Sequence, residues 1–224
     1  MIDPPSKTLT EEAATQGITL SSSQAALLEQ YCQLLWDWNT RINLTRHTDY
    51  PKFVARDLID SLAFAEFLQP KERVLDVGTG GGVPGIVLAV MRPDLRVTLS
   101  ESIGKKARVV TEIVERMGLK VEVYQGRAQD QLAEKKFDTL VVRAVARLAK
   151  LLEWFQPSWH RFDRLLILKG PSWVDERGEA RHLGRLHGLS LRKLKTYPMP
   201  GTEADSVLLQ IRKENGKGKE AEED

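Results

Sequence analysis

The chain has 224 residues, of which 42% are hydrophobic, so it is long enough to bury the core of one α/β domain with a modest extension. No apolar run approaches the roughly 18 residues that a membrane span needs, and the N-terminus MIDPPSKTLTEEA does not have the order of a signal peptide, which predicts a cytoplasmic protein. Cys32 is the single cysteine, which excludes an internal disulfide, and the four histidines show no ligand spacing with carboxylates, so we predict no metal.

The net charge of +2 conceals an uneven distribution. Between Arg143 and Lys195, twelve Lys and Arg residues stand against five Asp and Glu residues, an excess of seven positive charges. This excess predicts an anionic partner such as nucleic acid. The alternative is a set of solvated helix faces with no partner.

The N-terminal part of the chain divides into an arm and a helical extension. Residues 1–20 are polar with few periodic apolar positions, and we expect a flexible arm. Residues 21–70 are expected to form a helical extension in front of the main domain. Three serines at 21–23 offer N-caps to its first helix, whose apolar positions have helical spacing: Leu27, Leu28, Tyr31, Leu34, Leu35 and Trp38.

A turn interrupts this extension. Asn39, Asn43 and Thr45 lie in the segment WNTRINLTRHTD, where their side chains compete with helical hydrogen bonds and favour a structured turn. Helical character resumes over 53–68 and stops near Pro70.

From residue 71 to 212 strand and helix patterns alternate, which predicts a largely parallel, doubly wound sheet. We expect strands at 73–77, 96–100, 121–124, 137–143, 164–169, 189–196 and 206–212. Helices are expected near 84–91, 105–117, 147–156 and 173–187. The connection 197–205 is too short for a crossover helix, so the last two strands should form an antiparallel hairpin at one edge. The charged tail 213–224 lacks apolar anchors and is expected to be disordered.

The segment RVLDVGTGGGVPGI at 73–86 has the pattern of a cofactor loop. A short apolar strand is followed by glycines, which let the backbone turn sharply and approach a ligand. Pro84 suits the first turn of the helix that follows. The segment therefore predicts a strand, a glycine loop and a helix in that order.

Two cofactors compete for this loop. Gly80, Gly82 and Gly85 satisfy the dinucleotide fingerprint G-x-G-x-x-G, but the strand should end just before the first of these glycines and instead ends at Val77, before Gly78, and Pro84 interrupts the expected spacing. The carboxylate of Asp76 would repel a pyrophosphate, whereas it can receive the cationic amino group of a methionine moiety directly or through water. S-adenosylmethionine therefore fits better than NAD.

Polar residues also follow the next two strands. Glu101 can accept hydrogen bonds from both ribose hydroxyls of an adenosine, and Gln129 lies in a segment, 126–130, that can read the adenine edge. The alternatives are that Glu101 caps the following helix and that Gln129 is a turn residue. The sequence contains neither a P-loop nor a G-x-S-x-G elbow, which argues against a nucleotide triphosphatase and a serine hydrolase.

Several segments in fixed order resemble one family: WNTRINLT, RDLIDSL at 56–62, VLDVGTGGGVPGIVLAVMRPDLRVTLSESIGKK, VVRAVARL at 141–148 and LKG at 168–170. Over residues 25–212 the chain resembles the bacterial 16S ribosomal RNA guanine-N7 methyltransferases, also called glucose-inhibited division protein B. The resemblance implies a class I methyltransferase fold, Rossmann-like with seven strands and a terminal antiparallel hairpin, for a methyltransferase domain at 71–212 behind the helical extension. It also implies S-adenosylmethionine as cofactor and a guanine of the 16S decoding region, in naked RNA or a small-subunit particle, as substrate.

Carried over by motif, the family's cofactor contacts are Gly78, Val83, Ala128, Gln129 and Arg143. The physical argument adds Asp76, Gly80 and Glu101. For RNA contacts the candidates are Arg143, Arg147 and Lys169. Arg143 is alternatively a phosphate ligand or a structural ion-pair partner, and Lys169 alternatively extends its amine from the core.

The chain departs from the family pattern at two places. Asp57 stands where the family has His in the motif R-H-x-x-D-S, and the last strand starts with Asp205, Ser206 and Val207 instead of an R-H-L-type sequence. We expect the cofactor site to be unaffected and the consequences to lie on the substrate side.

Guanine N7 carries a free lone pair, so methyl transfer needs no general base and depends on positioning. Asn39, Asn43 and Arg143 are the candidates for orienting the guanine, with turn capping as the alternative for Asn43. We expect a monomer. Two other functions remain open from the sequence: an NAD(P)-dependent reductase, and a non-catalytic RNA-binding protein with a degenerate cofactor pocket.

Overall fold

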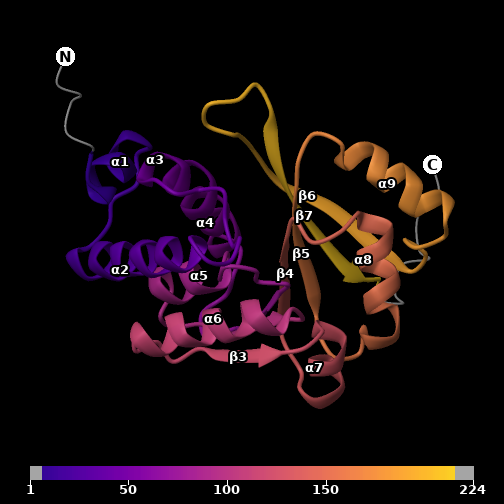
Figure 1. The fold of residues 1–224 in the computed structure, drawn as a ribbon. Coiled ribbons are helices and arrows are strands. Elements are labelled where there is room, and N and C mark those ends of the chain that lie inside the picture. Colours follow the sequence, from indigo (N-terminus) through magenta and orange to yellow (C-terminus); the bar gives the residue numbers. More distant parts are fainter. Residues whose placement is uncertain (1–6, 215–224) are drawn as a thin grey trace.

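A seven-stranded sheet in the order β3-β2-β1-β4-β5-β7-β6 forms the centre of the molecule. The computed structural model describes residues 7–214. Helices cover both faces of the sheet, and the N-terminal helices lie together on one side of it (Figure 1). The strands are β1 (Arg73–Val77), β2 (Arg96–Glu101), β3 (Glu122–Gln125), β4 (Thr139–Arg143), β5 (Arg164–Lys169), β6 (Leu189–Pro198) and β7 (Asp205–Lys213).

The first five strands are parallel, and the last two form the expected antiparallel hairpin. β7 inserts between β5 and β6 and runs antiparallel to both. The register aligns Val77 with Ser100 on one side and with Val142 on the other, so the carboxyl ends of β1, β2 and β4 meet at one edge. In parallel sheets this edge is where ligands bind.

Two hydrophobic cores lie on opposite faces of the sheet because successive strand residues point to opposite sides. In β1, Val74 belongs to the core shared with α5 (Gly85–Met91) and α6 (Gly104–Arg116). Leu75 and Val77 belong to the other core. Its helices are α7 (Ala128–Glu134), α8 (Leu148–Phe155) with the short turn η2 (Gln156–Ser158), and α9 (Trp173–His182).

The helical extension shares the first of these cores and does not have one of its own. It consists of α1 (Leu9–Thr15), α2 (Ser22–Asn39), α3 (Tyr50–Lys52), the π-helix η1 (Phe53–Leu58) and α4 (Ile59–Ala65). Buried residues of α2 and η1 are in one continuous cluster with those of α5 and α6, among them Leu28 and Phe53. The extension is therefore packed onto the sheet as an integral layer.

The structure differs from the sequence expectations in two helices. Residues 9–15, predicted as part of a flexible arm, form α1, which Thr8 and Glu11 begin with a capping box and which buries Leu9 completely. Its seven residues are too few for periodicity to identify, so its stability comes from packing. No helix was expected at 128–134, where α7 forms. The predicted disordered tail, 213–224, lies outside the described residues apart from Lys213 and Glu214, and β7 continues to Lys213.

Candidate functional site: a cleft with two walls

A cleft of about 990 Å³ opens at the carboxyl ends of the parallel strands. One wall, here called the cofactor wall, consists of the glycine loop after β1 and the end of β2, including Gly78, Gly80, Val83 and Glu101. The second wall, here called the substrate wall, comprises the loop 43–47, η1 and α4 of the extension, and the loop after β4. The volume of the whole cleft is at the upper end of the range typical of cofactor sites.

The glycine loop owes its shape to glycines at positions that disfavour a side chain. Gly78 and Gly80 have φ values of +65° and +61°, in the left-handed region. A Cβ atom on Gly85 would lie 2.1 Å from Leu99 Cδ2 and 2.7 Å from Asp76 Oδ2. The loop backbone therefore approaches β1 and β2 as closely as sterics permit.

Asp76 belongs to β1, is buried against this loop and does not line the cleft. Its Oδ2 accepts hydrogen bonds from Thr79 Oγ1 at 2.6 Å and from the Gly85 amide at 2.8 Å, while its buried Oδ1 has no partner within the protein. Burial raises the pKa of Asp76 to about 6, although these hydrogen bonds favour the ionised form. Asp76 thus holds the loop, and its predicted contact with an ammonium group remains a prediction that depends on Oδ1.

Glu101 lines the cleft at the end of β2, as the sequence predicted. Its two carboxylate oxygens accept hydrogen bonds from the Gly80 amide at 2.9 Å and the Ile103 amide at 2.7 Å. The bond from Ile103, the residue that directly precedes α6, agrees in part with the alternative that Glu101 caps this helix. Each oxygen keeps a further lone pair for a ligand hydroxyl. Ala128 and Gln129 begin α7 and are not among the residues that line the cleft.

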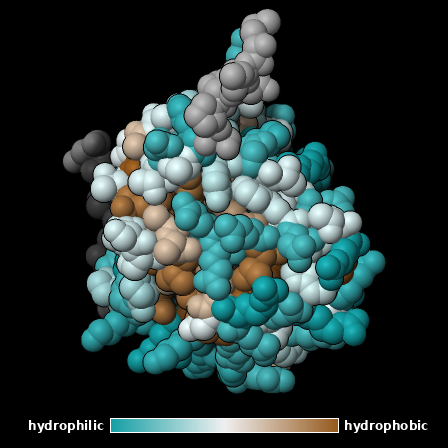
Figure 2. All heavy atoms as spheres, turned by 60° about the vertical axis from the view of Figure 1, so that its left-hand side comes forward, coloured by the Kyte–Doolittle hydropathy of each residue, from teal (hydrophilic) through white to brown (hydrophobic). Residues whose placement is uncertain are grey.

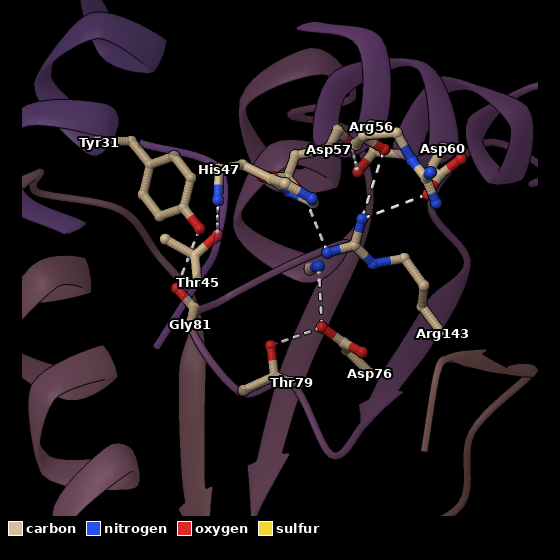
Figure 3. Close-up of polar contacts among 12 residues, drawn as sticks. Tyr31, Thr45, His47, Arg56, Asp57, Asp60, Asp76, Thr79, Gly81 and Arg143 are labelled. Carbon is tan, nitrogen blue, oxygen red and sulfur yellow. Dashed lines mark hydrogen bonds and ion pairs between the residues drawn. The ribbon is translucent and has the colours of Figure 1, made fainter. Parts of the chain in front are cut away.

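Arg143 forms the centre of the substrate wall (Figure 3). Its Nη2 lies 2.8 Å from Asp57 Oδ1, an ion pair whose angle does not make a hydrogen bond, and its Nη1 donates to Asp60 Oδ2 at 3.3 Å. Burial opposes the charged form of Arg143, but the two aspartates raise its pKa. The structure therefore assigns Arg143 the ion-pair role that the sequence left open, while it also lines the cleft.

Two side chains extend this ionic network to distant parts of the chain. His47 Nδ1 lies 3.0 Å from Asp57 Oδ2, and the Tyr197 hydroxyl donates to Asp60 Oδ1 at 2.8 Å. Burial raises the pKa of Asp60, against the opposing effects of Arg143 and Tyr197. Asp57, the departure from the family motif, is thus held between a histidine and an arginine. Ser206, part of the second departure, is buried and also lines the cleft.

Sequence reasoning missed His47, Tyr197 and Tyr31. Tyr31 donates from α2 to the Gly81 carbonyl at 2.9 Å and so joins the extension to the glycine loop. It was read only as an apolar helix position. His47 lies two residues after the NLT segment, which is a local signal, but no pattern near Tyr197 points to a partner 137 residues away.

The two candidate asparagines have different surroundings. Asn39 Oδ1 accepts hydrogen bonds from the amides of Leu44 and Thr45, at 2.8 and 2.9 Å, and the residue is not among those that line the cleft. It shapes the turn that places the loop 43–47. Asn43 is exposed and lines the cleft, so it remains a candidate for contact with substrate.

The basic segment is less available than its charge count suggested. Seven of its twelve cations form ion pairs: Arg143, Arg147, Lys150, Arg164, Lys169, Arg185 and Lys195. Lys169 donates to Glu176 Oε2 and to the Ala146 carbonyl, both at 2.7 Å, and only 10% of its side chain is exposed. Arg147 pairs with Glu179 at the surface. Several partners, such as Glu72 of Arg164, lie outside the counted segment, and the count could not include them.

In residues 7–214 no group of three or more His, Cys, Asp or Glu side chains is arranged to hold a metal ion. Over the same residues, no helix is both long and apolar enough to cross a membrane. On the face drawn in Figure 2, hydrophilic residues predominate, with hydrophobic ones in patches between them.

Solved structures share this fold at low sequence identity. TrmK of M. capricolum, solved with the cofactor product S-adenosyl-homocysteine, superposes with a TM-score of 0.55 at 13% identity over 71% of each chain. A precorrin-6y C5,15-methyltransferase of Geobacter metallireducens gives a TM-score of 0.51 at 14% identity, over 77% of this chain and 91% of that one. The sheet order, terminal hairpin and glycine-loop cleft define a class I S-adenosylmethionine-dependent methyltransferase fold.

Residues 24–200 match the family described as rRNA small subunit methyltransferase G, and the chain belongs to that family. Ribosomal RNA small subunit methyltransferase G of Rhodopirellula baltica is 52% identical over 199 residues, which are 89% of this chain and 85% of that protein. The protein of the same name from Lachnoclostridium phytofermentans is 34% identical over 88% of this chain and 84% of its own length. The predicted family and fold class are confirmed, and the reductase alternative is dropped.

Proposed function

We propose that this protein transfers a methyl group from S-adenosylmethionine to N7 of a guanine in 16S ribosomal RNA. The observation that carries the proposal is family membership across 24–200 together with a cleft at the sheet edge where the family motifs meet. Since ribosomal RNA is the substrate, we place the protein in the cytoplasm.

The cofactor wall fits this methyl donor. The Glu101 carboxylate lines the cleft and has lone pairs for ribose hydroxyls. Asp76 does not itself line the cleft, and its buried, unpartnered Oδ1 is the acceptor that we assign to the cationic amino group, directly or through water. Gly78 and Gly80 present backbone without side chains to the cleft. When bound, S-adenosylmethionine supplies an electrophilic methyl group on a sulfonium.

The substrate wall has the groups that positioning requires. Guanine N7 has a lone pair and no proton, so the reaction needs no residue to remove one. The rate then depends on holding N7 in line with the methyl carbon. Arg143 and Asn43 both line the cleft and can donate hydrogen bonds to guanine O6, and we assign them this orienting role.

The test is transfer of radiolabelled methyl groups to 16S RNA and to small subunits from a strain that lacks the activity. We expect label at a single guanine N7, with transfer that falls steeply as salt rises because the RNA contacts are ionic. Labelling of naked RNA and particles in parallel identifies the true substrate. Binding of S-adenosylmethionine with no transfer to either would instead support an RNA-binding protein without catalysis.

A further inference from the structure

The cationic side chains that line the cleft fall into two groups. Arg143, Arg147 and Lys169, the residues expected to contact RNA, all have carboxylate partners. Among the described residues, Arg46, Arg56 and Lys106 form no ion pair, although all three line the same cleft. Lys106 belongs to α6, which follows Glu101 in the chain. Arg46 and Arg56 belong to the helical extension and are part of the substrate wall.

Arg56 carries a buried donor that the protein leaves unused. Its Nε is inaccessible to solvent and has no hydrogen-bond partner, which is rare for a guanidinium nitrogen. Its carbonyl accepts from Arg143 Nη1 at 3.3 Å, so η1 fixes its backbone beside the ionic network. Asp60 lies close enough for the positive charge to favour its ionised form, but the two side chains make no ion pair.

Arg46 is exposed on a loop whose backbone is held in place. Thr45 Oγ1 accepts from the His47 amide at 3.0 Å, and Asn39 Oδ1 accepts from the Thr45 amide at 2.9 Å. The His47 carbonyl in turn accepts from Trp36 Nε1 at 2.7 Å. The loop therefore presents a charged guanidinium at the cleft from a fixed position.

We propose that Arg46 and Arg56 bind backbone phosphates of the RNA next to the target guanine. A guanidinium can donate two parallel hydrogen bonds to phosphate oxygens. Because Arg46 and Arg56 have no carboxylate partner, no ion pair has to be broken before they bind a phosphate. This proposal rests on the proposed function for the identity of the nucleic acid. It moves the phosphate contacts from the basic segment 143–195 to the N-terminal extension.

The carboxylate of the cofactor is the other oxyanion that could reach these residues. In Figure 3, however, Arg56 lies on the far side of Arg143 from Asp76 and Thr79, and thus away from the glycine loop. Arg46 belongs to the loop 43–47, in which Leu44 adjoins Gly81 of the glycine loop. The placement of Arg56 therefore favours the substrate, and for Arg46 the measurement of cofactor affinity separates the two oxyanions.

The experiment measures binding of unmethylated 16S RNA at several salt concentrations for Arg46→Gln, Arg56→Gln and a matched control, Arg41→Gln. Arg41 belongs to the same extension but stacks over the Trp38 ring at 5.2 Å and is not a cleft residue. Each cleft variant should reduce the slope of log affinity against log salt by about one and weaken binding on the order of tenfold at low salt. The control should keep the wild-type slope.

S-adenosylmethionine affinity, measured by calorimetry, should be unchanged in both cleft variants. A loss of cofactor affinity with an unchanged salt slope would assign these residues to the cofactor carboxylate and overturn the proposal, as would no change in either quantity. Arg56 is partly buried, so Arg56→Gln could affect folding. Arg56→Lys keeps the charge and should restore most of the salt slope, and Arg46 is exposed, so Arg46→Gln tests the proposal without a risk to folding. If the wild type transfers no methyl group, the proposed function is refuted. The salt slopes would still show whether Arg46 and Arg56 contact RNA phosphates.

Discussion

The two walls of the cleft are built by different means. Behind the cofactor wall, Asp76 accepts hydrogen bonds from Thr79 and Gly85, three and nine residues away. On the substrate wall, the contacts of Asp60 with Arg143 and Tyr197 span 83 and 137 residues. A motif can encode the first wall locally, whereas the second exists only after the whole chain has folded. Variants of the two walls should therefore fail differently.

The largest effect is expected on the substrate wall. Arg143→Met leaves the buried carboxylates of Asp57 and Asp60 without their cation and should lower the free energy of unfolding by about 3–5 kcal/mol. Urea denaturation measures this change in the free energy of unfolding. Arg147→Met is the control: the ion pair of Arg147 with Glu179 is exposed, so this substitution should change the free energy of unfolding by no more than about 0.5 kcal/mol. Equal effects of the two substitutions would contradict the buried network.

A smaller loss of stability with a complete loss of cofactor binding is expected on the cofactor wall. In Gly85→Ala the new methyl group would clash with Leu99 and with Asp76 Oδ2, at an expected cost of about 1–3 kcal/mol. Gly178→Ala is the matched control. Gly178 lies in α9, where the new methyl group would have no atom within 4 Å. Because alanine favours a helix more than glycine does, Gly178→Ala should stabilise the protein by roughly 0.5–1 kcal/mol. Normal S-adenosylmethionine binding by Gly85→Ala would refute this account of the loop.

The smallest effect tests whether Asp76 contacts the cofactor or only holds the loop. Because its pKa is about 6, raised by burial, Asp76 is largely ionised at pH 7 and protonated at pH 5. A bound ammonium group favours the ionised form, so S-adenosylmethionine affinity should fall as pH falls below about 6, approaching tenfold per unit. Calorimetry from pH 5 to 7 measures this change, and Asp76→Asn should abolish it. If the S-adenosylmethionine affinity of the wild type does not change over this pH range, Asp76 holds the loop and does not contact the cofactor.

Much of the fold was readable from the sequence because its signals are local. The bounds of β1 and β5 are those predicted, since each is a short apolar run between polar residues. The glycine loop and Glu101 line the cleft as expected because the loop follows β1 directly and Glu101 is the last residue of β2.

The remainder depends on partners that no local pattern reveals. α1 is stable because Leu9 and Ala13 are buried against other helices, and its sequence alone is too short to predict it. The charge count of the basic segment could not show that seven of its twelve cations are paired, because partners such as Asp57 and Glu72 lie far away in the chain. Arg143 could be named as a site residue from its motif, but its two aspartates could not be assigned to it.

The hydrogen bond from Tyr31 to the Gly81 carbonyl has a consequence for the order of events during synthesis. The helix α2 is translated before any strand of the sheet, yet its buried residues Leu28 and Tyr31 belong to the core that α5 and α6 complete. The extension therefore leaves the ribosome with its apolar face uncovered and must wait for more than fifty further residues before it can pack. An enzyme that modifies ribosomal RNA thus depends, for its first helices, on the residues that the ribosome adds later.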